Sequence, residues 1–475
     1  MNNHKEKIKF YHILIITILI LTSASFVFNW VPIEVLRYVS ILLLASQIWY
    51  EIISNDRLFL TSPLFLLSSS SLVFFSFFQG LALDLYQPVG FSRVLIAIGS
   101  DAERYIAAFG CVMLAGHILV SSVKKIKPKS KKRKRIVDNY LIYNYFIFFI
   151  IILTFVNIYY FHTEPDPAAI LNVPLRHFLP PLQTFMLLLL IRKNFINGER
   201  FSFLTGLFSC IIFGGMFAVH EGKIPILFGT VIILYYMRLT KLSIKKIFFC
   251  CFITLILGIT GLQLISVMRS PEGSMETFIS GSVAEDLGDN NLPKLLRAPL
   301  LKAVYRQTDT IYCLNKVLNY HSEDIFILSK QFFWLEGLVP RIIWPDKPSL
   351  SMGKIYTRKY CVFSSNPNHH SSVTLLGQPF ITGGNIGLFL NIGLLILGLS
   401  GITLLTRETL SLSTLSVVAL TPWLIDMDQN FGLYVANLVK FFFIIFPLII
   451  IIGFSEKNKH IWRFINLLNL REKTK

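Results

Sequence analysis

The stretch YHILIITILILTSASFVFNW, residues 11–30, follows a basic N-terminus and is apolar over almost its whole length. A helix of about 20 residues spans the hydrocarbon core of a bilayer. The small residues Ser23, Ala24 and Ser25 resemble a signal-peptide cleavage site. However, the run is longer than a signal core, and another apolar run begins at residue 33. We therefore interpret the first run as an uncleaved membrane span.

The composition of the whole chain agrees with this interpretation. Of its 475 residues, 53% are hydrophobic and only 15% are charged, with a mean hydropathy of +0.60. Such a composition is typical of a polytopic membrane protein. The net charge of +18 does not indicate a nucleic-acid partner, because basic residues of membrane proteins concentrate in cytoplasmic loops.

Apolar windows of bilayer length recur along the chain. Because they lack the strict alternation of a β-barrel strand, we predict an all-α polytopic protein with about twelve transmembrane helices. The predicted spans are residues 9–29, 33–52, 59–79, 103–122, 139–161, 178–191, 203–219, 224–238, 246–267, 384–405, 413–427 and 432–453.

Lysine and arginine determine the predicted orientation. The basic segments 124–135, 192–200, 238–246 and 456–464 all fall on the side of the N-terminus. The positive-inside rule then places both termini in the cytoplasm, which an even number of spans requires. Segment 124–135 could also bind anionic lipid or a partner, but a topogenic cytoplasmic loop is the simpler interpretation.

The predicted organisation has three parts. Residues 1–267 carry nine spans, residues 268–383 form a large external loop, and residues 384–475 carry three spans and a cytoplasmic tail. Long loops without an evident connecting role are usually functional. We therefore expect the chemistry in the loop.

Cations with a few carboxylates are dispersed through this loop. Arginine offers a planar fork of donors that suits phosphate oxygens, and lysine is a compact charge for the same ligand. Each cation could instead pair with a neighbouring carboxylate or a lipid headgroup, and Trp344 could either stack on a sugar or line the membrane interface. The candidate binding residues of the loop are Arg269, Arg306, Arg341, Trp344 and Lys347, and Asp309 lies one helical turn after Arg306.

A second cluster lies in AVHEGKIP, residues 218–225, at a predicted external turn. Ionisable residues near membrane depth are costly and usually functional. Glu221 is a candidate general base, with Lys223 beside it to tune its basicity or to bind substrate. The alternative is a polar turn among lipid headgroups. Weaker candidates on external turns are Arg176, His177, Asp426 and Asp428.

The sequence contains no HExxH, GxSxG, Walker, dinucleotide-binding or CxxC motif. His369 and His370 are adjacent, which is a poor spacing for two ligands of one metal. We therefore expect no metal and no cofactor. Cys313 and Cys361 both lie in the loop, where an oxidising compartment would let them pair, but two cysteines give no spacing signature and the pairing stays open.

Two segments carry a resemblance to a known family. WLEGLVPRIIWPDKPSL, residues 334–350, and ITGGNIGLFLNIG, residues 381–393, resemble the Wzy-type O-antigen and oligosaccharide repeat-unit polymerases of bacterial inner membranes. The resemblance implies a GT-C-like polymerase or ligase architecture with one large periplasmic loop late in the chain.

The resemblance also implies a reaction. A metal-independent, inverting glycosyl transfer at the periplasmic face would move a growing glycan from undecaprenyl pyrophosphate to the non-reducing end of a new lipid-linked repeat unit. The expected base is Glu221, or else Asp309 or His370, and the expected pyrophosphate ligands are Arg269, Arg306, Arg341 and Lys347. Membrane lipids and a chain-length regulator protein are further expected partners. The alternatives are an O-antigen ligase and a non-enzymatic flippase or transporter of lipid-linked oligosaccharides.

Overall fold

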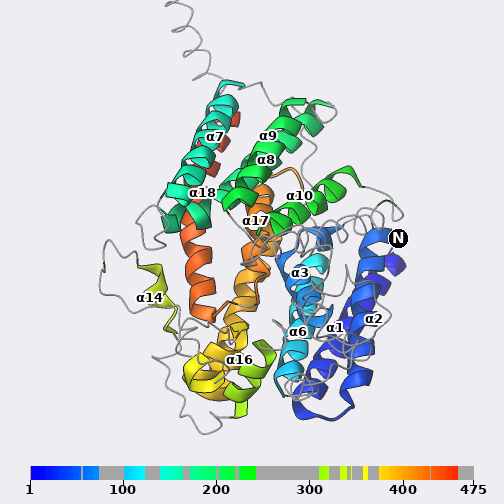
Figure 1. Cartoon of the computed structure of the whole chain (residues 1–475). Helices are drawn as coiled ribbons and strands as arrows, with labels where there is room; N and C mark the ends of the chain where they lie inside the picture. Colours follow the sequence, from blue (N-terminus) through cyan, green and yellow to red (C-terminus); the bar gives the residue numbers. More distant parts are fainter. Residues whose placement is uncertain are drawn as a thin grey trace, which may run out of the picture. The chain divides into compact units, whose positions relative to one another are not determined.

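The computed structural model describes fourteen ranges of the chain, and no strand occurs in them (Figure 1). The prediction of an all-helical chain is confirmed for this part. The described residues are 2–54, 57–73, 101–123, 140–163, 172–198, 203–219, 224–241, 246, 310–319, 332–339, 344, 357–361, 374–427 and 429–457.

Helices occur in every predicted membrane window except 246–267, nearly all of which lies outside the described residues. Three of them, α2, α6 and α16, are long and apolar enough to cross a membrane, so the chain is compatible with a membrane protein. The number of twelve spans stays a prediction. The helices are α1 (Asn2–Phe28), α2 (Ile33–Ile53), α3 (Pro63–Ser69), α6 (Asp101–Ser122), α7 (Tyr140–Thr163), α8 (Asn172–Asn197), α9 (Phe203–Val219), α10 (Ile224–Thr240), α14 (Leu335–Leu338), α16 (Thr374–Leu405), α17 (Leu412–Leu424) and α18 (Phe431–Lys457).

Helix α16 begins ten residues before the predicted start of its span at residue 384. Pro379 and the pair Gly383–Gly384 lie inside it, and glycine and proline normally indicate helix ends. At Gly383 and Gly384 the backbone is not helical, so α16 consists of two helical pieces, and the predicted start of the span at residue 384 coincides with the break between them. The first piece, which contains Pro379, is buried from Thr374 to Phe380. The predicted boundary between the loop and the last three spans, at residues 383 and 384, stays a prediction.

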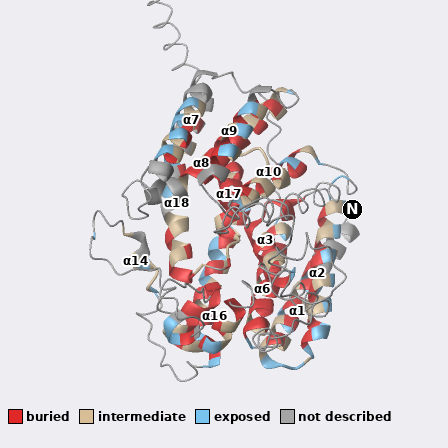
Figure 2. Cartoon of the chain, viewed as in Figure 1, coloured by how far each residue is buried: buried red, intermediate tan, exposed pale blue. Residues whose placement is uncertain are grey.

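The described chain divides into two units. Unit 1 comprises Met1–Lys124, Lys241–Leu404 and Trp423–Val439, and unit 2 comprises Lys125–Thr240, Leu405–Pro422 and Lys440–Lys475. Within unit 1, α6 is the central helix: 72% of its apolar window is buried, against 28% for α2 and for α16 (Figure 2). The other two helices therefore keep faces that suit lipid.

Small residues let helices approach α6 closely. Ser23 of α1 donates a hydrogen bond to the carbonyl of Ala108 at 3.3 Å, and Ser68 of α3 donates one to the carbonyl of Gly110 at 2.8 Å. A Cβ atom at Gly110 would lie 2.8 Å from Cγ of Leu72. Interfaces of this kind are typical of helix packing in membranes, where small residues bring backbones together.

Ion pairs join α2 to α6 at both ends. Near the starts of the two helices, Nε of Arg37 donates to Oε1 of Glu103 at 2.9 Å. Near their ends, Nε2 of His117 lies 2.5 Å from Oε1 of Glu51. Fourteen residues separate the two paired positions on each helix, a rise of about 21 Å. The equal spacing keeps the two helices parallel and in register.

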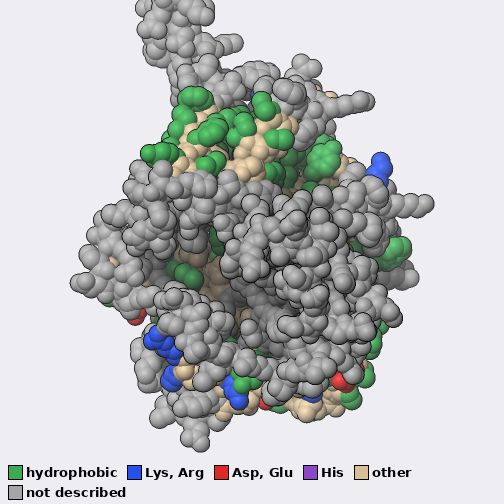
Figure 3. All heavy atoms as spheres, in the orientation of Figure 1, with side chains coloured by type: hydrophobic (Ala, Val, Ile, Leu, Met, Phe, Trp, Pro, Cys, Tyr) green, Lys and Arg blue, Asp and Glu red, His purple; other side chains and the backbone are tan. Residues whose placement is uncertain are grey.

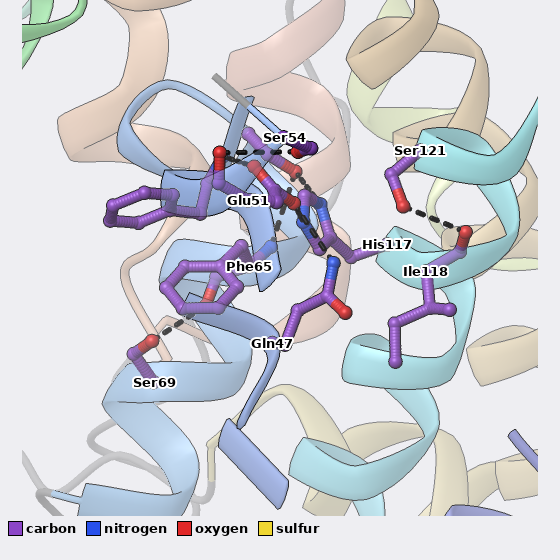
Figure 4. Close-up of polar contacts among 10 residues, drawn as sticks. Gln47, Glu51, Ser54, Phe65, Ser69, His117, Ile118 and Ser121 are labelled. Carbon is purple, nitrogen blue, oxygen red and sulfur yellow. Dashed lines mark hydrogen bonds and ion pairs between the residues drawn. The ribbon is translucent and has the colours of Figure 1, made fainter. Parts of the chain in front are cut away.

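The second of these pairs belongs to a buried polar cluster (Figure 4). The Glu51 carboxylate also accepts hydrogen bonds from Nε2 of Gln47 at 3.0 Å and from the backbone N–H of Phe59 at 2.7 Å. Nδ1 of His117 lies 2.8 Å from Oγ of Ser62, the N-cap of α3. Glu51 and His117 are both almost completely buried. One cluster therefore ties α2, α3 and α6 together.

Unit 2 contains α7 to α10, also joined by buried polar contacts. Nε2 of Gln183 on α8 donates to Thr154 on α7 at 2.7 Å, and Nδ2 of Asn194 on α8 donates to Thr205 on α9 at 2.9 Å. Hydrophobic side chains gather on the exposed surface over α7 and α9 (Figure 3). The exposed side chains include Phe149 and Leu207. Such a surface suits lipid better than water.

We expect His117→Leu to lower the stability of the protein by about 3 kcal/mol, because the substitution leaves the Glu51 carboxylate buried without its partner. The double variant Glu51→Leu/His117→Leu should recover most of this loss, because apolar replacement of a buried pair is often neutral. The measurement is the thermal unfolding midpoint of the purified protein in detergent. A double variant that is less stable than the single one would contradict the pairing.

Candidate functional site

Most of the predicted site residues lie outside the described part of the chain. Their roles therefore stay predictions. These residues are Lys223, Glu221, Arg269, Arg306, Asp309, Arg341, Lys347 and His370. Trp344 is the exception: it lies outside regular structure and its side chain is 39% exposed.

The residues before Trp344 show how the first of the two resembling segments is anchored. Phe333 packs edge-on against Phe431 at the start of α18, with ring centroids 6.2 Å apart. A Cβ atom at Gly432 would lie 2.9 Å from the Phe333 ring. The absence of a side chain at Gly432 therefore lets α14 and the start of α18 approach each other. Val339, which precedes Pro340, is extended, as expected for a residue before proline.

The second resembling segment contains a break in α16. Gly383 has φ −166° and ψ 26°, and Gly384 has φ 56° and ψ −150°. The latter combination is accessible essentially only to glycine. A break leaves backbone N–H and C=O groups without helical partners. At membrane depth such groups are tolerated only where they are buried in protein or line a polar cavity.

A polar side chain of α6 forms a hydrogen bond to the residue directly after this break. Oη of Tyr105, on α6, donates a hydrogen bond to Oδ1 of Asn385 at 2.9 Å, directly after the two glycines. Tyr105 lies two residues after Glu103, which pairs with Arg37 of α2. Between them, Nη1 of Arg104 is enclosed and has no hydrogen-bond partner among the residues that the structure describes. The break is thus linked to α6 through the phenol of Tyr105.

The N-terminal half of α16 also contacts the turn between α17 and α18. The backbone N–H of Leu375 donates to the carbonyl of Met427 at 3.2 Å. Oε1 of the buried Gln378 accepts a hydrogen bond from the backbone N–H of Gly432 at 3.0 Å. Residues next to both resembling segments therefore contact Gly432: Phe333 directly precedes the first segment, and Gln378 lies three residues before the second.

The turn after α17 adds hydrogen-bonding groups. Nε2 of Gln429 donates to Oδ2 of Asp426 at 2.9 Å, and Nδ2 of Asn437 donates to Oε1 of Gln429 at 3.4 Å. Oδ1 of Asn430 is buried and makes no hydrogen bond. Asp426 was among the weaker sequence candidates, and Asp428 lies outside the described residues.

We call the residues around the break and this turn the α16 cluster, defined by Tyr105, Gln378, Asn385, Asp426 and Gln429. Amides, a phenol and a carboxylate are the groups that hydrogen-bond sugar hydroxyls. The described residues contain no group of three or more His, Cys, Asp or Glu side chains close enough to hold a metal ion. The expectation that no metal takes part stays a prediction.

The cysteines of the described residues differ in whether they are disulfide-bonded. Cys313 lies in a helical segment, residues 310–319, and is disulfide-bonded. Cys111 and Cys210 are free, so neither is its partner. The pairing of Cys313 with Cys361, which the sequence leaves open, stays open.

Sequence reasoning missed the members of the α16 cluster on α6 and α16, and also the Glu51–His117 pair. A signal was present for the pair, because Glu51 and His117 are ionisable residues within predicted spans, where such residues are rare. No local pattern indicated that Tyr105 and Asn385, 280 residues apart, would meet.

Comparison of the chain with protein-family models, with characterised proteins and with solved structures gives no match. The fold therefore defines only a class: an all-helical chain whose helices α2, α6 and α16 are long and apolar enough to cross a membrane.

Gly432→Ala should destabilise the protein by about 1–3 kcal/mol, because the added methyl group overpacks the contact with the Phe333 ring. Gly398→Ala is the matched control, since nothing lies within 4 Å of a Cβ at that position of α16. Thermal unfolding midpoints in detergent measure both variants. Equal midpoints for the two variants would show that α14 does not pack closely on α18.

Proposed function

We propose that this protein polymerises undecaprenyl-pyrophosphate-linked oligosaccharide repeat units into O-antigen or a related surface polysaccharide at the periplasmic face of the inner membrane. The observation that carries the proposal is that residues next to the two segments that resemble Wzy-type polymerases meet at Gly432: Phe333 directly precedes the first segment, and Gln378 lies three residues before the second. Segments that act on one substrate must lie close together, and more than 40 residues of chain separate these two contacts.

The α16 cluster supports a sugar-binding role for α16 and the residues that contact it. Its phenol and one amide meet at the helix break, between α6 and α16, and its other groups form hydrogen bonds in the first half of α16 and in the turn after α17. Discontinuous helices with freed backbone groups are typical of sites for polar substrates in membrane proteins. In the proposed complex, this cluster holds the glycan, and the exposed Trp344 stacks on a sugar ring.

The disulfide at Cys313 supports the proposed compartment. Disulfides persist in the periplasm and are rare in the cytoplasm. Because Cys313 is disulfide-bonded, the periplasmic side is favoured for the segment from residue 269 to residue 383 that contains it. The distribution of lysine and arginine favours the same side.

The proposed reaction is an inverting glycosyl transfer without metal. A base, Glu221 or else Asp309 or His370, removes the proton from the acceptor hydroxyl as it attacks the anomeric carbon of the donor glycan. The bond from that carbon to undecaprenyl pyrophosphate breaks. Arg269, Arg306, Arg341 and Lys347 stabilise the departing pyrophosphate, since electrostatic stabilisation of developing charge is often the largest catalytic contribution.

The break in α16 also favours a second candidate function. Transporters commonly bind substrates at discontinuous helices, so a flippase of lipid-linked oligosaccharides is the main non-enzymatic alternative. An O-antigen ligase is the enzymatic alternative, because the resemblance extends to an architecture that polymerases and ligases share.

Deletion of the gene separates the three functions by the glycan ladder on a gel. We expect the lipid core to carry a single repeat unit, because ligation and flipping continue without chain extension. Loss of a ligase would instead leave polymer on its carrier, and loss of a flippase would leave no repeat unit on the core. An unchanged ladder would contradict the proposal.

Arg341→Ala should abolish chain extension while the protein still accumulates in the membrane, because the pyrophosphate loses its bidentate partner. Arg341→Lys should restore activity only in part if the planar fork matters. Arg358→Ala is the control, since Arg358 is an exposed arginine of the same predicted loop. The measurement is ladder length together with membrane protein level. A normal ladder from Arg341→Ala would remove Arg341 from the mechanism.

A further inference from the structure

Arg57 lies in the turn that joins α2 to α3, directly before the 3-10 turn Leu58–Leu60. Its side chain is buried, with 7% exposure. Its backbone is left-handed, with φ 51° and ψ 31°, a conformation that is uncommon for residues other than glycine, asparagine and aspartate. Two unfavourable features therefore coincide at one residue.

Within the part of the chain that the structure describes, the enclosed Nε and Nη1 atoms of Arg57 have no hydrogen-bond partner. The nearest described carboxylate along the chain, Glu51, is already occupied. Its Oε1 interacts with Gln47 and His117, and its Oε2 accepts from the backbone of Phe59. Within the described ranges, no acidic side chain forms an ion pair with Arg57.

A buried cation without a partner is costly. Burial disfavours its charged form, and this lowers the pKa of Arg57 from its ordinary value. Unsatisfied buried polar groups in native proteins call for an explanation such as a bound ion. Strained backbone conformations likewise cluster at ligand sites, where the surrounding structure holds them.

We propose that Arg57 binds a phosphate group on the predicted cytoplasmic side of the chain. A guanidinium fork matches the oxygens of phosphate bidentately. The turn containing Arg57 follows α2, and the predicted topology places it on the side of the N-terminus and of the basic segment 124–135. Phosphate oxygens are abundant at that level of a membrane, in lipid headgroups, and also occur in the cytoplasm as free phosphate. The site is separate from the proposed periplasmic chemistry.

The test uses the purified full-length protein in a maltoside detergent, which contains no phosphate. Phosphatidylglycerol and inorganic phosphate are added in separate titrations, and the thermal unfolding midpoint is followed. We expect at least one of them to raise the midpoint of the wild type. Arg57→Ala should weaken the apparent affinity about tenfold or more, because a hydrogen-bonded charge pair is lost.

A response to phosphatidylglycerol alone assigns the site to a lipid headgroup, and a response to inorganic phosphate assigns it to free phosphate. Arg57→Lys should respond more weakly than the wild type, because it keeps the charge but lacks the fork. Lys241→Ala is the matched control and should respond like the wild type. Lys241 also has a left-handed backbone, with φ 51°, but its side chain is exposed.

The same experiment distinguishes a ligand site from a structural arginine. Without phosphate, Arg57→Ala should be at least as stable as the wild type, because an uncompensated buried charge has been removed. If Arg57→Ala is instead less stable by the same amount with and without phosphate, a protein acceptor such as the neighbouring Asp56 holds the guanidinium, and the proposal is overturned. An undiminished response of Arg57→Ala to both additives also overturns it.

Discussion

The hydrogen bond between Glu51 and His117 is the interaction on which the described part of unit 1 depends most. Burying a carboxylate is costly unless it is paired and hydrogen-bonded, and here the Glu51 carboxylate has an imidazole, an amide and a backbone N–H around it. These partners come from α2, α6 and the turn before α3. The Arg37–Glu103 pair, fourteen residues earlier on both helices, sets the same register at the other end. Together the pairs orient α6, whose first turns present Tyr105 to the break in α16.

Sequence reasoning predicted the helices well because the bilayer constraint is strong. A long apolar run must become a helix to satisfy its own backbone groups, and helices are found in the windows that the structure describes. It predicted boundaries less well. Gly383 and Gly384, at the predicted edge of a span, do break the helix, but a further helical piece that begins at Thr374, contains Pro379 and is buried over residues 374–380 precedes the break. Local signals for helix ends cannot indicate that a segment will be covered by the rest of the chain.

The candidate site was predictable only in part. The segment ITGGNIG was identified by resemblance, but only the structure shows that its glycines break α16. The partners of that break, Tyr105 and Gln378, carry no motif, and Gln378 matters because of where Gly432 lies. Trp344 is exposed as a sugar-stacking residue requires. The roles of the predicted base and of the predicted phosphate ligands in the loop and at residues 218–225 remain those expected from charge and topology.

The central claim is that the chain extends a lipid-linked glycan, and reconstitution tests it most directly. The purified protein would be placed in liposomes with undecaprenyl-pyrophosphate-linked repeat units, in the presence of a metal chelator and without nucleotide. The account predicts a ladder of longer lipid-linked glycans together with release of undecaprenyl pyrophosphate. Repeat units that keep their original length, with protein that is folded by its thermal unfolding transition, would contradict the account.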